Sequence, residues 1–280
     1  MSKSKINQIM QKYNLSFHKG LGQNFLYDEN YLEKIVDAGE ITKDDTVLEI
    51  GPGLGVLTEK MAPKAKKVIA VEIDNNIIPA LKENLKDFDN VEIINEDILK
   101  TDIKFITKNE ANIKVIANLP YYITTPIITK LLESDINLER IVIMVQKEVA
   151  ERLTSCVGTK DYGAITVCVN FFADTSLLFT VPKGAFVPAP KVDSAVVKLL
   201  LPKKEPVLVK NKDMFFKTVK GAFSQRRKTL LNSLSSFFNT LSKDDIKNAI
   251  TNSGFDENIR GEKLDIYDFV KLSENLEKFL

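Results

Sequence analysis

Asn118, Leu119, Pro120 and Tyr121 form a tetrapeptide whose groups suit the handling of a flat base that carries an amine. The side-chain oxygen of Asn118 and the backbone carbonyl of Leu119 can accept both hydrogens of that amine. The amine lone pair of adenine is delocalised into the ring, so holding both hydrogens favours a more tetrahedral nitrogen aimed at a methyl donor. The tetrapeptide therefore predicts a site that positions an adenine amine for attack.

The last two residues of the tetrapeptide support this geometry. Pro120 restrains the loop and biases Leu119 toward an extended backbone. Tyr121 offers an aromatic face, and stacking a base on such a face contributes about 1–3 kcal/mol. An ordinary structural turn is the alternative interpretation of this sequence. If the donor carries its methyl group on a sulfonium, transfer of that methyl group to nitrogen releases a neutral thioether. Such a leaving group needs no activation, so we expect neither a metal nor a catalytic acid.

A glycine-rich turn lies upstream, with Gly51, Gly53 and Gly55 following an apolar run. Glycine lets the backbone approach a ligand closely and adopt unusual dihedral angles. Dinucleotide binding is the competing interpretation, but its usual spacing is Gly-x-Gly-x-x-Gly, and here the spacing is Gly-x-Gly-x-Gly. The turn alone predicts a nucleotide-like ligand without naming it.

Two acidic residues narrow the choice of ligand. Glu72 follows the second predicted strand, where a carboxylate can accept hydrogen bonds from both hydroxyls of a ribose, and Asp97 follows the third. Either acid alone is as easily a solvated loop residue. Together with the glycines they predict a nucleoside-like ligand at one sheet edge, and S-adenosylmethionine fits better than a nicotinamide dinucleotide.

Residues 27–146 alternate between β-rich runs and amphipathic segments, which predicts parallel strands with crossover helices in a doubly wound α/β sheet. The predicted strands are 46–50, 67–71, 91–95, 114–117 and 141–145, with helices at 74–87 and 126–133. Apolar segments 164–172 and 192–201 predict two further strands that complete the sheet with an antiparallel edge.

The β pattern ends after residue 201, where a lysine-rich connector with two prolines begins. We therefore expect a first domain at 1–205, with an N-terminal arm at 1–27, and a small helical domain at 206–280. The helices predicted in the second domain are 214–223, 227–238, 243–252 and 266–280.

The net charge of +1 conceals a cluster, because residues 203–228 hold nine Lys or Arg and only two acids. A polyanion-binding surface is favoured over the alternative, a merely solvated face. The sequence shows neither a membrane-spanning stretch nor a signal peptide, so we expect a cytoplasmic protein. His18 is the sole histidine, expected at the surface, and Cys156 and Cys168 are the only cysteines, expected in the core.

The chain closely resembles the KsgA/RsmA family of ribosomal RNA adenine dimethyltransferases, from about residue 19 to beyond residue 260. The segments that carry the resemblance are 23–26 (Gln-Asn-Phe-Leu), 48–55 (Leu-Glu-Ile-Gly-Pro-Gly-Leu-Gly), 71–74 (Val-Glu-Ile-Asp), 95–98 (Asn-Glu-Asp-Ile), 117–122 (Ala-Asn-Leu-Pro-Tyr-Tyr), 186–194 (Phe-Val-Pro-Ala-Pro-Lys-Val-Asp-Ser) and 222–229 (Ala-Phe-Ser-Gln-Arg-Arg-Lys-Thr). The resemblance implies a Rossmann-like class I methyltransferase sheet of seven strands with a small C-terminal helical domain.

The resemblance also implies roles for single residues. Asn24 and Leu26 would close over the cofactor from the arm, and Phe186 would stack on the target base opposite Tyr121; a buried strand-end aromatic is the alternative for Phe186. Gly51 would lie under the methionine portion, Glu72 would bind the ribose, Asp97 would bind the adenine amine of the cofactor, and Asn118 would touch both ligands. The expected cofactor set is completed by Gly53, Ile73 and Ile98.

The implied substrate is a pair of adjacent adenines in the hairpin near the 3′ end of 16S ribosomal RNA, within an immature small subunit, and we expect a monomer. The residues expected to contact RNA phosphates are Lys217, Lys220, Arg226, Arg227 and Lys228. Two rival hypotheses are kept. One is an antibiotic-resistance enzyme that methylates 23S ribosomal RNA, and the other is mainly a checkpoint factor in ribosome assembly.

Overall fold

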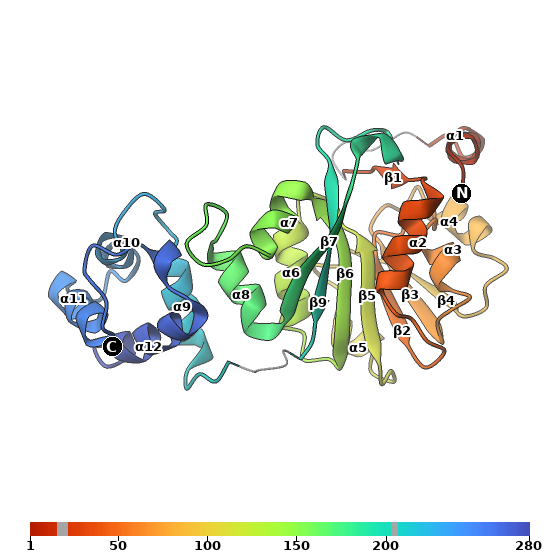
Figure 1. Ribbon diagram of the computed structural model, residues 1–280. Coiled ribbons are helices and arrows are strands. Elements are labelled where there is room, and N and C mark those ends of the chain that lie inside the picture. Colours follow the sequence, from red (N-terminus) through yellow and green to blue (C-terminus); the bar gives the residue numbers. More distant parts are fainter. Residues whose placement is uncertain (16–21, 203–206) are drawn as a thin grey trace. The chain divides into compact units, whose positions relative to one another are not determined.

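The computed structural model describes residues 1–15, 22–202 and 207–280 (Figure 1), so the prediction for His18 lies outside the described residues. The chain forms two compact units. The first comprises Met1–Ala150 and Thr175–Leu201, and the second comprises Glu151–Asp174 and Pro202–Leu280. Residues 151–174, which the predicted boundary near 205 leaves in the first domain, therefore cluster with the helical unit.

The first unit is built around a mixed sheet of seven strands in the order β4-β3-β2-β5-β6-β9-β7. The strands are β2 (Thr46–Ile50), β3 (Lys67–Glu72), β4 (Val91–Asn95), β5 (Ile113–Asn118), β6 (Leu138–Gln146), β7 (Asp174–Val181) and β9 (Ser194–Leu200). The first five are parallel, and β9 pairs antiparallel with β6. The fold class and the antiparallel strand predicted at 192–201 are confirmed, but β9 lies inside the sheet and β7 forms its edge.

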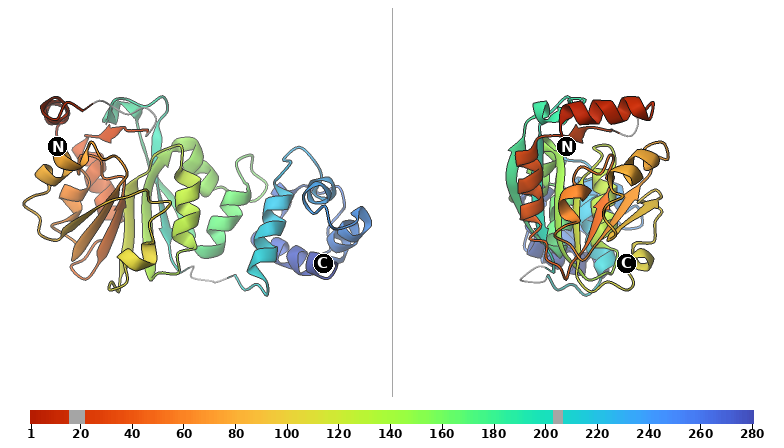
Figure 2. Two further views of the ribbon diagram at one scale, coloured as in Figure 1. Left: turned by 180° about the vertical axis from the view of Figure 1, so that it is seen from behind. Right: turned by 90° about the vertical axis from the view of Figure 1, so that its right-hand side faces the viewer.

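The central strands are apolar because both of their faces are covered. Every residue of β2 is buried, as are the last five of β3. Such continuous burial is typical of parallel strands with helices on both faces. In Figure 1 α2 lies in front of the sheet, and in the reversed view of Figure 2 α5 does. Because β2 pairs with both β3 and β5, the strand order reverses there and opens a crevice at the carboxyl ends.

The prediction of a strand at 164–172 is wrong, because this segment forms the helix α8 (Ala164–Phe172). Val167 and Phe171 are buried in the core that α8 shares with the other helices of its unit, and most other residues of the segment are apolar too, so the sequence lacks the polar face that marks a surface helix. The strand that completes the sheet is β7, which follows α8 directly and which the sequence did not indicate.

The remaining elements of the first unit are short helices and a second, two-stranded sheet. They are α1 (Lys3–Lys12), α2 (Glu29–Ala38), α3 (Thr58–Met61), α4 (Ile78–Asn84), α5 (Ile103–Ile106), α6 (Thr124–Leu132), the 3-10 turn η2 (Lys183–Ala185) and a small antiparallel sheet of β1 (Phe25–Leu26) with β8 (Phe186–Val187). The helix α7 (Lys147–Leu153) contains the junction between the units.

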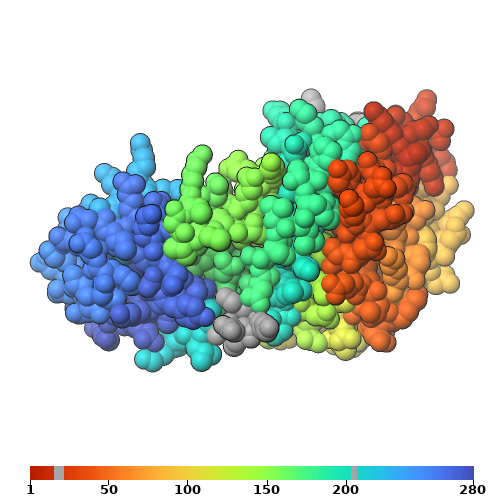
Figure 3. Space-filling view, viewed as in Figure 1, coloured from red at the N-terminus to blue at the C-terminus, as the bar shows by residue number. Residues whose placement is uncertain are grey.

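The N-terminal helix α1 is fastened to the first unit at both ends. Ile6 is fully buried in the core, Lys12 forms an ion pair with Glu83 at 2.7 Å, and the terminal amine of Met1 bonds to Glu29. The space-filling view shows its dark red atoms lying against the orange segment (Figure 3). The helix thus anchors the chain shortly before the arm residues that reach the site.

The second unit is a helical bundle around an aromatic core. Its helices are α8, α9 (Lys212–Ala222), α10 (Leu230–Phe237), α11 (Lys243–Asn252) and α12 (Ile266–Glu277), with the 3-10 turn η3 (Gly261–Lys263). Phe171 of α8 packs on Phe215 and Phe216 of α9, with ring centroids 5.1 Å apart in both pairs. This contact explains why α8 belongs to the helical unit.

Two smaller expectations are corrected in the second unit. The predicted helix at 227–238 begins only at Leu230, because Thr229 caps it by accepting a hydrogen bond from the Asn232 N–H. Cys156 is exposed and Cys168 is partly so, rather than core thiols. Among the described residues, no helix is long and apolar enough to cross a membrane.

Candidate active site

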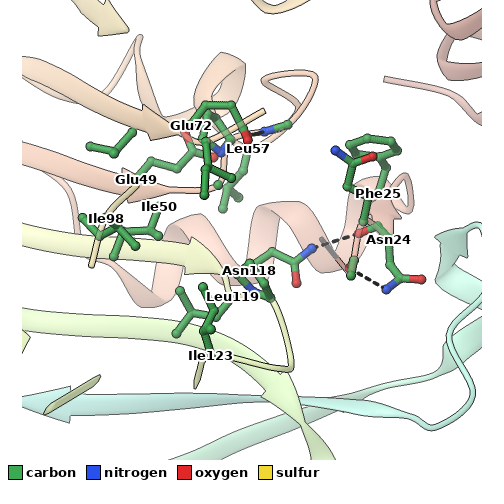
Figure 4. A pocket seen from close by; sticks show the side chains of 18 of the residues that line it. Asn24, Phe25, Glu49, Ile50, Leu57, Glu72, Ile98, Asn118, Leu119 and Ile123 are labelled. Carbon is green, nitrogen blue, oxygen red and sulfur yellow. Dashed lines mark hydrogen bonds between the residues drawn. The ribbon is translucent and has the colours of Figure 1, made fainter. Parts of the chain in front are cut away.

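A pocket opens at the carboxyl ends of β2, β3 and β5, at the point where the strand order reverses (Figure 4). The residues that line it include all but one of those expected to bind cofactor or base: Asn24, Leu26, Gly51, Gly53, Glu72, Ile73, Asp97, Ile98, Asn118, Leu119, Pro120 and Tyr121. The structure thus brings together side chains from segments that lie far apart in the sequence.

The floor of the pocket is the glycine turn after β2. Gly51 and Gly53 have φ of +67° and +60°, a region that disfavours other residues. A Cβ built on Gly53 would lie 2.6 Å from the ring of Phe25, so a side chain there would push the arm away. Glycine at this position therefore allows the arm to close over the turn.

Glu72 is held in place by the turn and by its own loop. One carboxylate oxygen accepts the Gly53 N–H at 3.0 Å, and the other accepts the Asp74 N–H at 2.9 Å. Burial raises the pKa of Glu72, which the backbone hydrogen bonds oppose. Each oxygen keeps a further lone pair for a ligand hydroxyl.

Asp97 lines the pocket beyond the end of β4. Its side chain accepts the Leu99 N–H at 3.0 Å, which fixes the loop, and Ile98 beside it is buried. Ile73 and Tyr122 also line the pocket and are substantially exposed, at 44% and 53%. Apolar surface next to a carboxylate suits a flat ring with an amine at its edge.

Asn118 points into the pocket, and its side chain has a fixed orientation. Its Nδ2 donates to the backbone carbonyl of Asn24 at 3.1 Å (Figure 4). Because the two ends of a carboxamide point apart, Oδ1 is directed away from the arm as an acceptor. Leu119 continues the strand geometry, since its N–H donates to the Met144 carbonyl at 3.0 Å.

The arm is tied to the pocket by a second bond that the sequence did not indicate. Gln23 Nε2 donates to the carboxylate of Asp74 at 2.7 Å, while the other oxygen of Asp74 accepts the Asn76 N–H. The two residues lie in separate motifs, and nothing in their spacing shows that they meet. Gln23 and Asp74 thus form a latch between the arm and the loop after β3.

Tyr121 is held by a hydrogen bond to the start of β9. Its hydroxyl lies 2.7 Å from Ser194 Oγ, and Ser194 is fully buried. Burial raises the pKa of Tyr121, so the phenol stays neutral at physiological pH. The ring is therefore fixed at its far end before any base arrives.

Phe186 is the expected residue that the structure does not bring to the pocket wall. It is 2% exposed, it pairs with Leu26 in the β1–β8 ribbon, and its side chain belongs to the hydrophobic core. Stacking of Phe186 on a base opposite Tyr121 would require this ribbon to rearrange, so that role stays a prediction.

Glu49 is a pocket residue that sequence reasoning missed. It is fully buried in β2 and accepts a hydrogen bond from Thr58 Oγ1 at 2.5 Å. Burial raises the pKa of Glu49 to about 8, so most molecules carry a neutral carboxylic acid here at pH 7. An acid in the middle of an apolar strand was the available signal.

The basic residues expected to contact RNA belong to the second unit. Lys217, Lys220, Arg227 and Lys228 are exposed and form no ion pair within the described residues. Arg226 is partly committed, because its guanidinium donates to the carbonyls of Lys160 and Tyr162 at 2.9 and 3.0 Å. In the described part of the chain, no group of three His, Cys, Asp or Glu could hold a metal ion.

The switch-point pocket with its glycine turn, and the antiparallel strand inserted near the sheet edge, define a class I methyltransferase fold. Residues 14–278 match the family described as Ribosomal RNA adenine dimethylase. The chain belongs to this family.

Curated relatives agree along nearly the whole chain. Ribosomal RNA small subunit methyltransferase A of Clostridioides difficile (strain 630) is 50% identical over 269 residues, covering 95% of this chain and 93% of that protein. The protein of the same name from Alkaliphilus metalliredigens (strain QYMF) is 47% identical over 279 residues, covering 99% and 97%.

Two solved structures are similar in fold and sequence. A dimethyladenosine transferase from Plasmodium falciparum has a TM-score of 0.74 and 32% identity, covering 91% of this chain and 100% of that chain. The 23S rRNA methyltransferase ErmE has a TM-score of 0.67 and 26% identity, with the same coverage.

Proposed function

We propose that this protein transfers methyl groups from S-adenosylmethionine to the N6 amines of two adjacent adenines in the hairpin near the 3′ end of 16S ribosomal RNA. The orientation of Asn118 is the observation that carries the proposal. Its Nδ2 is occupied by the Asn24 carbonyl, so Oδ1 is the end that faces an incoming amine. If the site required a hydrogen-bond donor at this position, Nδ2 of Asn118 would be left free in place of Oδ1.

The pocket residues fit the proposed cofactor by the chemistry of their free groups. Glu72 retains acceptor capacity for two ribose hydroxyls, and Asp97 lies where an adenine edge can be recognised. The Glu49 carboxyl can ionise when a cationic ligand binds nearby, because the positive charge lowers its pKa. When bound, the cofactor supplies an electrophilic methyl group on a sulfonium.

The residues of this chain position the target base. The Asn118 side-chain oxygen and the Leu119 carbonyl accept the amine hydrogens, which directs the nitrogen lone pair toward the donor. Tyr121, fixed through Ser194, offers the stacking face. The amine proton leaves to water after transfer, and positioning in a crevice that excludes water supplies most of the acceleration.

We propose that the substrate is RNA within an immature small subunit, bound by a monomer in the cytoplasm where subunits are assembled. The exposed lysines and arginines of the second unit would hold RNA phosphates without reading bases. Identity to the small-subunit relatives is higher than to ErmE, which favours the small-subunit substrate over 23S RNA.

The decisive experiment incubates the protein with labelled S-adenosylmethionine and unmethylated small or large subunits, and then maps the modified nucleotides. We expect two adjacent dimethylated adenines in the small subunit and none in the large one. Modification of one adenine in the large subunit would support the resistance-type enzyme. Binding to small subunits without any methylation would support a checkpoint factor and overturn the catalytic proposal.

A further inference from the structure

A shallow groove lies in the second unit between the turn that follows α9 and the start of α11. It is lined by Gln225, Lys228, Asn232, Ser235, Ser236 and Lys243. Three of these residues, at positions 232, 235 and 236, lie on one face of α10 because their spacing matches one helical turn. Lys243 is the first residue of α11. Of these residues, only Lys228 is among those expected from the sequence to contact RNA phosphates.

Most polar side-chain groups of this groove lack a partner among the described residues, the exception being the Ser236 hydroxyl, which donates to the Asn232 carbonyl at 3.0 Å. Ser235 Oγ is buried and makes no hydrogen bond, and the side chains of Gln225, Asn232 and the two lysines bind no other described residue. Other lysines of the same unit are paired: Lys210 with Glu274, and Lys247 with Glu257. A buried hydroxyl without a partner costs free energy, which a ligand would recover.

The turn that carries Gln225 and Lys228 is fixed by hydrogen bonds to the residues that pack against it. The Gln225 N–H donates to the oxygen of the fully buried Ser233, and the Lys228 N–H donates to the Gln225 carbonyl at 2.9 Å. Arg226 ties the same turn to the carbonyls of Lys160 and Tyr162. The backbone of these two groove residues is therefore ordered before a ligand binds, so binding loses less conformational entropy than it would in a flexible loop.

The groups that line the groove favour an anion with several acceptor oxygens. No carboxylate lines it, although Asp244 and Asp245 lie in the first turn of α11, where Asp245 accepts the N–H and hydroxyl of Ser242. Two ammonium groups, two side-chain amides and the Ser235 hydroxyl can all donate. A phosphate group presents matching oxygens, and lysine binds it as a point charge.

We propose that this groove binds one backbone phosphate of the RNA substrate, with Lys228 and Lys243 supplying charge and Ser235, Asn232 and Gln225 supplying hydrogen bonds. This inference rests on the proposed function, since it takes the phosphate to come from that RNA. It assigns Lys243, on a different helix from the basic turn, to the same contact.

The test compares two full-length variants of equal net charge. In K228Q/K243Q the groove loses its charges, and in the control K271Q/K278Q two exposed lysines elsewhere in the unit are neutralised. We expect the groove variant to bind small subunits about tenfold more weakly. The plot of log affinity against log salt should also become less steep, by about one unit of slope. The control should change affinity less than about twofold. Equal losses in both variants would overturn the proposal.

Two further measurements show whether the bound phosphate comes from RNA or is free phosphate. They also test the groove independently of the proposed methylation. S235A should weaken binding about threefold without changing the salt slope, because it removes a neutral donor. Amide resonances of residues 225–236 and 243 should shift when inorganic phosphate is added to wild type but not to K228Q/K243Q. Phosphate shifts combined with unaltered subunit binding would assign the groove to free phosphate and overturn the RNA contact. This titration does not depend on methylation, so it stays interpretable if catalysis is absent.

Discussion

The pocket of the first unit and the basic surface of the second unit are specified in different ways. In the pocket, Glu72 and Asn118 are each oriented by hydrogen bonds to backbone groups of another segment. On the basic surface, Lys217, Lys220 and Arg227 are exposed and pair with no described residue. Geometry thus determines what the pocket can do, whereas charge determines what the surface can do.

This difference indicates where substitutions should act. A transition state is stabilised by groups already in place, so loss of one oriented acceptor should reduce turnover strongly. Long-range attraction to phosphates is shared among many cations, so loss of one should reduce affinity modestly and in a salt-dependent way. The four predictions below test this separation.

The largest effect is expected at Asn118. N118A removes the acceptor and should lower kcat by about 10²–10³ while small-subunit affinity changes only a few-fold. The control is N90A, which removes amide-to-carbonyl bonds to Ala62 and Ala65 in the same unit outside the pocket. Single-turnover rates and subunit binding check both. Near-normal turnover of N118A would refute the assigned role.

The next effect concerns Glu49 and pH. The Glu49 carboxyl has a pKa of about 8 in the folded protein and an ordinary value of 4.5. The contribution of this group to the stability of the folded state is therefore fully present below about pH 4.5 and is lost as the pH rises to about 8. E49Q lacks this titration. Between pH 5 and 8 the free energy of unfolding of E49Q should therefore rise relative to wild type by about 2–4 kcal/mol. Parallel pH curves of the two proteins in denaturant unfolding would contradict it.

The latch between Gln23 and Asp74 should affect the cofactor more than the RNA. Q23E sets two carboxylates against each other and should weaken S-adenosylmethionine binding about tenfold. In the double variant Q23E/D74N the amide and the carboxylate are exchanged, so most of the affinity should return. Calorimetric titration of both single variants and the double variant measures the coupling. Additive losses would show that the bond does not position the arm.

The smallest effect separates two neighbouring arginines. R226A removes two hydrogen bonds to backbone carbonyls and should lower the free energy of unfolding by about 1 kcal/mol. Arg227 makes no such contact with the described residues, so R227A should leave stability unchanged and weaken subunit binding a few-fold. Denaturant unfolding and filter binding distinguish the two. Identical behaviour of both variants would mean that Arg226 does not support the turn.

Sequence predicted the pocket well because its parts are local. The glycine turn, Glu72, Asp97 and the tetrapeptide each lie at or just beyond the carboxyl end of a parallel strand, and the sheet brings these ends together. The latch between Gln23 and Asp74 and the bond between Tyr121 and Ser194 were missed. Both join segments whose meeting depends on tertiary packing, which spacing along the chain does not show.

The errors in the fold have related causes. The segment 164–172 is apolar and rich in β-branched residues, so its local composition indicated a strand, but its partners are helices. Phe186, whose stacking role stays a prediction, is buried and pairs with Leu26, a pairing that its motif does not show. The start of α10 was placed three residues early because Arg227 and Lys228 are good helix formers, whereas Thr229 is the cap.

The division of the chain has a consequence for engineering. The polypeptide passes between the two units three times, because α8 lies in the helical unit and β7 returns to the sheet. Deletion of everything after residue 201 would strip the aromatic partners from α8 and expose Phe171 to water. A chimera that transplants the helical unit onto a relative must therefore carry residues 151–174 as well, and must be spliced at three junctions rather than one.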